Sequence, residues 1–213
     1  MRQNPSFAMT DLTELRRIIA QHPWATLVGT TAEGLQASHY AVLLDPERDD
    51  LTVVGHVGRP DDLILGLGVG ELLVMFQGPH GYISPGWYGD VAAVPTWNYV
   101  SVHLSGRPEI LSPEENLRVL EDLVAHFEAG QENPRGMWQA PNDEAFITRL
   151  AAGTVGFRLT PTRVVAKRKL SQNKSDETIE NVIFELGRDG SEARAALAAE
   201  MRRAHDQRRT AQA

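Results

Sequence analysis

The chain has 213 residues, 42% of them hydrophobic, and a formal net charge of −7. This predicts one large domain, or a main domain with a small helical appendage. Because there is no cysteine, disulfides, thiolate metal sites and cysteine nucleophiles are excluded. With no apolar leader at the N-terminus, we expect a cytoplasmic protein. The longest apolar stretch, residues 63–76, is too short and too interrupted for a membrane span.

The charge is unevenly distributed along the chain. Residues 1–162 carry 10 Lys and Arg against 20 Asp and Glu, whereas residues 163–213 carry 11 against 8. Nonspecific nucleic-acid binding needs a basic surface that neutralises phosphates. We therefore expect the main body to bind nucleic acid poorly, and only the C-terminal part could supply such a surface.

The first half of the chain predicts a helix followed by an antiparallel meander. Asp11 and Glu14 form a capping-box pattern at the start of a helix that ends at Pro23. Residues 59–62 form a loop into a short second helix. Apolar segments separated by polar turns indicate consecutive hairpins. We expect strands at residues 24–31, 35–44, 51–58 and 71–77.

Residues 76–108 are rich in aromatic side chains. Pro79, Pro85 and Pro95 predict that this stretch is divided into short extended pieces. From Pro95 onward the pattern has a period of two, which is typical of a strand with two different faces. One face carries Trp97, Tyr99, Ser101 and His103, and the other carries Asn98, Val100, Val102 and Leu104.

The second of these faces is typical of a hydrophobic core, whereas the first allows two interpretations. Aromatic rings with hydroxyls and an imidazole suit a flat ligand with polar edges. The alternative is an ordinary sheet with buried, hydrogen-bonded tyrosines.

The second half of the chain predicts helices on either side of two closing strands. Ser112, Pro113 and Glu115 mark a helix start, and Asn142 is expected to cap a short helix. Further strands are expected at residues 154–159 and 163–166, and further helices at residues 175–186 and from 191 to about 203. About six antiparallel strands with helices gathered before and after them predict a mainly β, α+β barrel with peripheral helices. We expect a barrel domain at residues 1–170 and a helical extension at residues 171–213.

Two polar motifs are candidate ligand contacts. Residues 56–59, with His56 and Arg59, could hold a phosphate or a carboxylate; the alternative is a surface arginine at a loop. Residues 167–174, KRKLSQNK, combine cations with amide and hydroxyl groups, or form a solvated linker. No nucleotide-binding loop or hydrolase motif is present, and the histidines are too scattered to predict a metal triad.

Three motifs resemble the PaiB family, described as FMN-binding negative transcriptional regulators. They read HGYISPGWYG, VPTWNYVSVH and KLSQNKSD. The resemblance covers roughly residues 7–190. It implies a six-stranded antiparallel split β-barrel of the FMN-binding type, an FMN cofactor, a small-molecule ligand and a homodimer with cofactor sites at the subunit interface. The function it implies is that of a regulator or an oxidoreductase.

The resemblance also implies cofactor-binding residues, although no catalytic residue. Arg59 and Lys169 would face the flavin phosphate, together with the loop around residues 167–174, and the aromatic face would flank the isoalloxazine ring. The predicted set is His56, Arg59, Trp97, Tyr99, His103, Lys169, Ser171, Gln172 and Asn173. The chain departs from the family where GRPDDLI replaces ARANPQW and where SPGWYG replaces SPSWYP.

The same resemblance extends to the piperazate synthases, which bind haem b and close an N–N bond on an N-hydroxylated ornithine. A haem alternative requires an axial ligand, and in a chain without cysteine a histidine is the natural candidate. His56 is the first choice, followed by His103 or His39. The substrate would then be amino-acid-like.

A third possibility is a non-catalytic ligand-binding or interaction protein. A homodimer is expected, because residues 63–69 and the aromatic stretch near Trp87 and Tyr88 provide more apolar surface than one small barrel needs.

Overall fold

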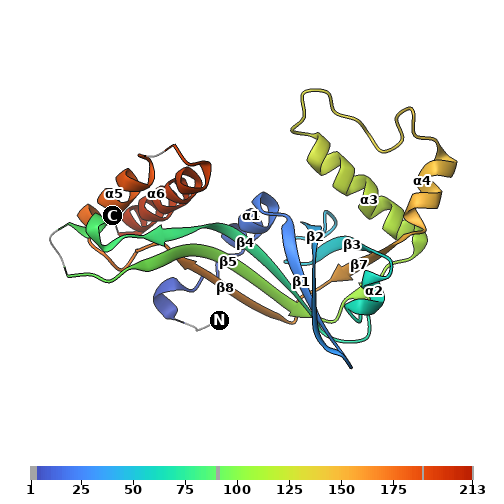
Figure 1. Cartoon of the computed structure of the whole chain (residues 1–213), viewed down its shortest axis with the longest axis horizontal. Helices are drawn as coiled ribbons and strands as arrows, with labels where there is room; N and C mark the ends of the chain where they lie inside the picture. Colours follow the sequence, from blue (N-terminus) through green and yellow to red (C-terminus); the bar gives the residue numbers. More distant parts are fainter. Residues whose placement is uncertain (1–3, 90–91, 189, 213) are drawn as a thin grey trace. The chain divides into compact units, whose positions relative to one another are not determined.

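The computed structural model describes residues 4–89, 92–188 and 190–212. Within them the chain forms one predominantly antiparallel sheet with helices before, between and after its strands (Figure 1). The strands are β1 (Trp24–Thr31), β2 (Gly34–Leu44), β3 (Val53–Gly58), β4 (Leu72–Ile83), β5 (Thr96–Gly106), β6 (Glu109–Ile110), β7 (Thr154–Leu159) and β8 (Arg163–Lys169). The α-helices are α1 (Leu12–Gln21), α2 (Asp61–Ile64), α3 (Pro113–Glu128), α4 (Glu144–Ala151), α5 (Asp176–Leu186) and α6 (Glu192–Gln212), and the 3₁₀ turns are η1 (Pro5–Phe7) and η2 (Pro85–Tyr88).

The sheet order is β6-β7-β3-β2-β1-β4-β5-β8. The β1–β2 hairpin pairs Trp24 with Ala41 and Thr31 with Gly34, and the next hairpin pairs β2 with β3. The mainly β class and the antiparallel split-barrel type are therefore as predicted. The count of about six strands was too low, because eight are present in the described chain.

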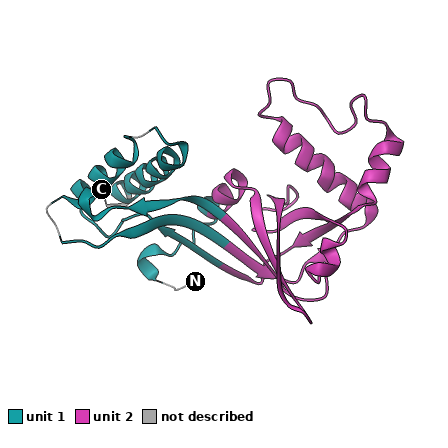
Figure 2. Ribbon diagram, in the orientation of Figure 1, with its two compact units in different colours: residues 1–14, 77–102, 165–213 teal, residues 15–76, 103–164 magenta. Residues whose placement is uncertain are grey.

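The chain divides into two compact units (Figure 2). Unit 1 comprises residues 1–14, 77–102 and 165–213, and unit 2 comprises residues 15–76 and 103–164. Three strands, β4, β5 and β8, contribute residues to both units. This grouping of contacts differs from the predicted division at residue 170, which remains a proposal.

Part of the core of unit 2 lies between β2, β3 and α3. The apolar side chains of Leu43, Val54, Leu111, Val119 and Leu123 form one buried cluster there. Ser112 caps α3 with a complete capping box, as the sequence predicted. Glycine at position 156 of β7 gives α3 room, because a Cβ there would lie 2.7 Å from Oδ1 of Asn116.

Next to this cluster, a buried ion pair connects the loop after β2 to β7. Arg158 Nε donates to Oδ2 of Asp45 at 2.8 Å, and Nη1 of Arg158 reaches Oε1 of Glu115 at 3.4 Å. The pKa of Arg158 is raised, first by its hydrogen bond to Asp45. The pair satisfies Asp45, which is only 1% exposed.

The core of unit 1 is made by α5 and α6 over the buried faces of β4 and β5. Val182, Leu197 and Met201 are buried, and the amide of Asn98 on β5 donates to Sδ of Met201 at 3.4 Å. A Cβ at Gly81 of β4 would lie 2.9 Å from Leu197, so glycine there allows α6 to approach the strand. Ser175 caps α5, the helix predicted at residues 175–186.

Several predicted boundaries were wrong. The third strand begins at Val53 rather than at residue 51, and β8 continues to Lys169 rather than ending at residue 166. Pro79 does not interrupt β4, which continues to Ile83. The neighbouring strand β1 pairs with β4 only over Leu72–Met75. Proline, which has no N–H, is tolerated on a side of a strand that has no hydrogen-bonded neighbour. Asp143, rather than Asn142, caps α4. Finally, α6 continues to Gln212, well past Arg203. No helix in the described ranges is long and apolar enough to cross a membrane.

One buried carboxylate holds α6 in unit 1. The Glu14 side chain is 9% exposed and accepts hydrogen bonds from Arg168, Arg203 and Gln207. Because its removal leaves partly buried cations without a counter-charge, Glu14→Gln should lower the free energy of unfolding by about 2–3 kcal/mol. Chemical denaturation measures this change. Glu132→Gln, at an exposed loop position, is the control, and an equal loss in both variants would contradict the assignment.

Candidate functional site

The two faces of β5 differ as the sequence predicted. Asn98, Val100 and Val102 are fully buried, whereas Tyr99 and Ser101 between them are half-buried. Trp97 is 55% exposed, and its ring lies 6.3 Å from that of Tyr82 on β4 in an edge-to-face arrangement. Unit 1 therefore presents an open aromatic face, which we define by Tyr82, Trp97 and Tyr99.

Two lysines of β8 border this aromatic face. The ammonium of Lys169 donates to Oγ1 of Thr96 and, at 2.9 Å, to the carbonyl of Trp97. Burial lowers the pKa of Lys169, and the neighbouring charge of Lys167 lowers it further. The Lys167 ammonium lies 5.6 Å from the centre of the Tyr99 ring, a cation–π contact. The face thus combines flat rings with positive charge, and it suits a planar anionic ligand.

The loop after β8 is held by hydrogen bonds to other parts of unit 1 and to its own backbone. Ser171 has a left-handed backbone (φ 62°) and is buried, and its hydroxyl accepts a 3.0 Å hydrogen bond from Asn98. The Gln172 side chain accepts from the backbone N–H of Leu170 at 2.7 Å and donates to the carbonyl of Ser6 at 3.2 Å. Asn173 is exposed. These contacts fix the loop that follows Lys169, and a role for its residues in cofactor binding stays a prediction.

In unit 2, the end of β3 carries a polar cluster. The Asp61 carboxylate at the start of α2 accepts hydrogen bonds from Ser38 (2.7 Å) and Tyr40 (2.8 Å). The Tyr40 hydroxyl in turn accepts from the backbone N–H of Gly58 at 3.1 Å. Burial raises the pKa of Tyr40, and its hydrogen bond to Asp61 raises it further. Sequence reasoning missed this cluster, because Ser38, Tyr40 and Asp61 carry no motif and meet only in the folded chain.

His56 lies beside this cluster. Its ring centre is 6.2 Å from that of Tyr40, and its Nδ1 is buried with no hydrogen-bond partner among residues 4–89, 92–188 and 190–212. Burial lowers its pKa, so the neutral imidazole is favoured.

Arg59 lines a cavity of about 530 Å³ within unit 2. The walls come from β6, β7, α3 and α4 and are mostly apolar, with Leu117, Ala151 and Val155 among them. Asn116 also lines the cavity; its Nδ2 donates to Oγ1 of Thr154 at 2.9 Å. A cavity of this size with few polar groups is typical of a small-molecule site. The sequence pointed to Arg59 but not to the helices that form the cavity.

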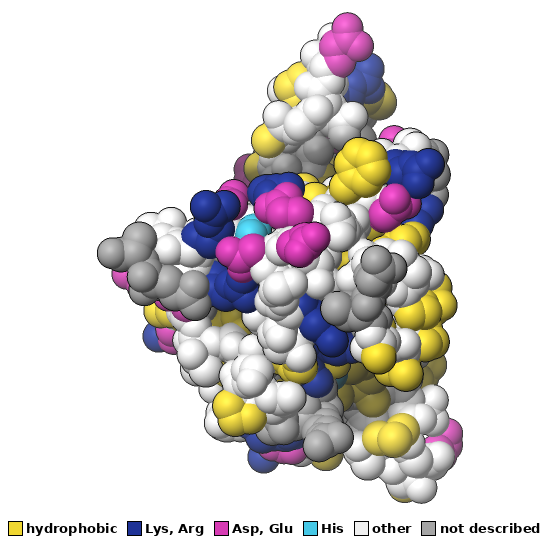
Figure 3. Space-filling view, turned by 90° about the vertical axis from the view of Figure 1, so that its left-hand side faces the viewer, with side chains coloured by type: hydrophobic (Ala, Val, Ile, Leu, Met, Phe, Trp, Pro, Cys, Tyr) yellow, Lys and Arg dark blue, Asp and Glu magenta, His cyan; other side chains and the backbone are white. Residues whose placement is uncertain are grey.

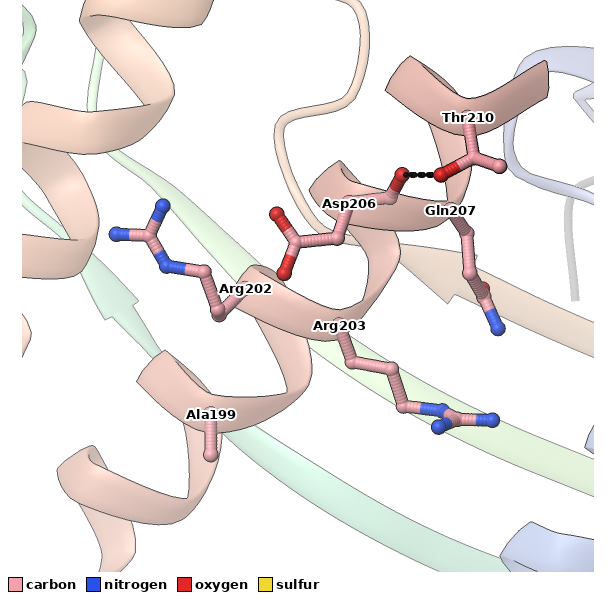
Figure 4. A pocket seen from close by; sticks show the side chains of 6 residues that line it. All are labelled: Ala199, Arg202, Arg203, Asp206, Gln207 and Thr210. Atoms are coloured by element: carbon pink, nitrogen blue, oxygen red, sulfur yellow. Dashed lines mark hydrogen bonds between the residues drawn. The ribbon is translucent and has the colours of Figure 1, made fainter.

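A larger hollow, of about 770 Å³, lies along α6 in unit 1 (Figure 4). Arg202 and Arg203 leave the helix in different directions, and each is paired: Arg202 with Glu180, and Arg203 with Glu14. Viewed from the side of α5 and α6, basic and acidic side chains are intermixed (Figure 3). The basic C-terminal segment therefore forms no field of one sign on this face.

A metal site is not evident in the described part of the chain. No group of three or more histidine, aspartate or glutamate side chains in it is placed to hold a metal ion. The predicted residues divide between the units: Trp97, Tyr99, Lys169 and the 171–173 loop belong to unit 1, whereas His56, Arg59 and His103 belong to unit 2.

His103, at the unit 2 end of β5, makes the stability of the fold depend on pH. Burial lowers its pKa below the ordinary value of 6.5, and the charge of Arg163 lowers it further. The unfolded chain therefore takes up a proton first as the pH falls, so the stabilising effect is present above about pH 6.5 and is lost below it.

We expect the free energy of unfolding to decrease from pH 6.5 downward, and His103→Gln to reduce this slope. Urea denaturation at several pH values measures the slope, and NMR titration reports the pKa directly. His126→Gln on the exposed side of α3 controls for histidine replacement. An unchanged slope in His103→Gln would rule out this residue as the source.

Comparison with known proteins identifies the family. The family model described as "Putative FMN-binding domain" matches residues 1–163. The chain is 31% identical over 182 residues to Protease synthase and sporulation protein PAI 2 of Bacillus subtilis, covering 84% of this chain and 86% of that protein. The flavocytochrome Anf3 of Azotobacter vinelandii has a similar structure, with a TM-score of 0.63 and 15% sequence identity over 84% of this chain and 78% of that one. The FAD and heme binding protein of Mycobacterium smegmatis is also similar, with a TM-score of 0.57 and 16% identity over 81% of this chain and 78% of that one. At such identities the two structures establish the fold alone. The chain therefore belongs to the PaiB family of FMN-binding-domain proteins, as its sequence motifs predicted.

Proposed function

We propose that this chain binds FMN and acts as a flavin-dependent oxidoreductase, with the aromatic face of unit 1 as part of the cofactor site. The observation that carries the proposal is Trp97: a 55% exposed indole on a strand whose other face is fully buried. The Trp97 ring lies beside that of Tyr82, so the exposed surface is a patch of neighbouring rings rather than a single residue, and such patches mark binding sites. Membership of an FMN-binding family indicates that the ligand is a flavin. The aromatic face offers rings and nearby cations that suit such a ligand.

In this proposal Trp97 and Tyr99 contact the isoalloxazine ring, and Lys169 provides positive charge at its edge. The low pKa of Lys169 reflects an ammonium that is already partly desolvated, so little further water is lost when an anion approaches it. Arg59 of unit 2 stays a separate predicted anion contact, with a guanidinium that is 57% exposed and paired with Asp62. Bound FMN would supply hydride and electron transfer.

The regulatory role implied by the family description has less support. A DNA-binding protein needs unpaired cations facing phosphates. On α6, Arg202 and Arg203 pair with carboxylates, and Arg208 pairs with Asp176. We therefore favour an oxidoreductase function over a DNA-binding function.

Haem binding is the second candidate, and His56 favours it. Burial favours the neutral imidazole, which is the form that ligates a metal, and the buried Nδ1 has no hydrogen-bond partner in the described chain. In this alternative His56 would be the axial ligand of haem b, and the chain would resemble the piperazate synthases in taking an amino-acid-like substrate.

The flavin proposal is tested by titrating the purified protein with FMN while following flavin fluorescence. We expect quenching in the wild type and a roughly tenfold weaker Kd in Trp97→Leu, the scale of one lost aromatic stacking contact. Phe184→Leu, at a 67% exposed ring of α5 in the same unit, is the matched control. Failure to bind FMN would oppose the proposal, and a Soret band after expression with a haem precursor would favour the second candidate.

We also propose that the chain is a homodimer. Unit 2 exposes several large apolar side chains: Leu35 is 75% exposed, Leu63 75% and Val69 79%. Of the other predicted contributors, Tyr88 is buried within unit 1, and Trp87 lies under the guanidinium of Arg194. The apolar residues near α2 are thus the better candidates for an interface.

Light scattering at micromolar concentration should give the mass of a dimer, and Leu63→Glu should shift it towards the monomer, because a charge would be buried in the interface. Leu150→Glu on α4, at a 54% exposed leucine, is the control. A monomer mass for the wild type, with or without FMN, would refute the dimer.

A further inference from the structure

The cavity between α3, α4 and β7 is formed within a single compact unit. Its volume is about 530 Å³, and every residue that lines it belongs to unit 2. The apolar part of the lining is aliphatic, with side chains of Ile110, Leu111, Leu117, Ala151 and Val155. A space of this size suits a small molecule. Aliphatic walls favour a hydrocarbon chain over a flat ring, because ring stacking needs an aromatic partner.

The polar groups of the wall are largely used within the wall itself. The Thr154 hydroxyl donates to the carbonyl of Ala151 at 2.8 Å and accepts from Nδ2 of Asn116 at 2.9 Å. Oδ1 of Asn116 has no hydrogen-bond partner in the described chain, but it is buried against Gly156 and gives a ligand no open acceptor. The interior of the cavity therefore suits the apolar body of a ligand better than a polar group.

One permanent cation lies at the opening of the cavity. Arg59 lines the cavity although its side chain is 57% exposed, and the pairing of β3 with β7 fixes its position. Gly58 is opposite Thr154 in this pairing, and the backbone N–H of Arg59 donates to the carbonyl of Gly153 at 3.0 Å. Nη1 of the guanidinium bonds to Asp62. A guanidinium has further N–H donors in a planar fork, so it can bind a second carboxylate alongside that one.

A negative charge also borders the cavity, at Glu114. This residue is exposed and lies in the first turn of α3. A helix N-terminus stabilises a negative charge, whether it belongs to a side chain or to a nearby ligand. Glu114 is thus stabilised without a cationic ligand, and an anion on Arg59 is favoured over a cation on Glu114.

We propose that the unit 2 cavity binds a medium-chain aliphatic monocarboxylate, with its hydrocarbon chain among the aliphatic side chains and its carboxylate on Arg59. The site lies wholly in unit 2 and uses no residue of the aromatic face assigned to FMN in unit 1. The inference therefore goes beyond the proposed function and does not depend on it.

The first experiment separates the chain from the carboxylate. Hexanoate, octanoate and octanamide are titrated into the wild type by isothermal titration calorimetry. We expect octanoate to bind about tenfold more tightly than hexanoate, because two more methylenes are buried. We also expect octanoate to bind about tenfold more tightly than the uncharged octanamide, the scale of one charge-assisted hydrogen-bonded contact. Equal affinity for the two acids, or tighter binding of octylammonium than of octanoate, would overturn the proposal.

Arg59→Gln tests the carboxylate contact. It should weaken octanoate about tenfold and leave octanamide within about twofold, since only the acid uses the guanidinium. Arg188→Gln is the matched control, because Arg188 is also an exposed arginine, 64% accessible, that pairs with a carboxylate three residues away, but in unit 1. Both ligands should bind this variant as they bind the wild type. An equal loss of octanoate in the two variants would reveal a general charge effect and would contradict the site.

Ala151→Leu tests the hydrocarbon contact by filling the cavity from α4. It should weaken octanoate by about tenfold or more, whereas Ala145→Leu at an exposed position of the same helix should leave it unchanged. The methyl resonances of Leu117 and Val155 give the same information without a substitution in the cavity. They should shift when octanoate is added to the wild type, and unshifted resonances would overturn the proposal even if Ala151→Leu fails to fold.

A last titration separates this site from the flavin site. Octanoate is titrated in the presence and absence of saturating FMN, and we expect its Kd to stay within about twofold. Loss of octanoate binding in the presence of FMN would assign Arg59 to the flavin and would overturn a separate site. Octanoate binding by a protein that does not bind FMN would refute the flavin proposal alone.

Discussion

The pleat of β5 is the constraint on which unit 1 depends. Successive side chains of a strand point to opposite faces. Elements that cover one face of β5 therefore leave the side chains of the other face uncovered. Asn98, Val100 and Val102 form the closed face, and Met201 of α6 contacts it through the amide of Asn98. The same amide donates to Ser171, which fixes the chain between β8 and α5. The aromatic face is thus available because α6 and the loop after β8 cover the opposite one.

The sequence predicted features that depend on a few neighbouring residues. The bounds of β1 and β7 are those expected from apolar patterning, and the capping box at Ser112 is complete. Such features are local, because a cap bonds to a backbone N–H two or three residues away. The alternation of buried and exposed side chains along β5 is also a local feature, so the open face could be predicted. The contact of Lys167 with Tyr99 on that face could not.

Features that depend on distant residues could not be predicted. Asp61 meets Ser38 and Tyr40 only because the β2–β3 hairpin brings the start of α2 beside β2. The unit 2 cavity needs two helices and β7 to form its walls, and nothing in the spacing of those residues indicates it. Pro79 was misjudged for the same reason: whether proline breaks a strand depends on whether a neighbour needs its N–H, and that neighbour is set by the sheet order.

Charge pairing in the two units separates structural arginines from one that can bind a ligand. In unit 1, Arg203 meets the buried carboxylate of Glu14, and Arg202 meets Glu180 on α5. Each of these pairs joins two elements of the fold, so the arginine is required to hold those elements together. Arg59 pairs only three residues along its own chain, and its head remains mostly exposed. The pair of Arg59 therefore joins no two distant elements of the fold, in contrast to those of Arg202 and Arg203.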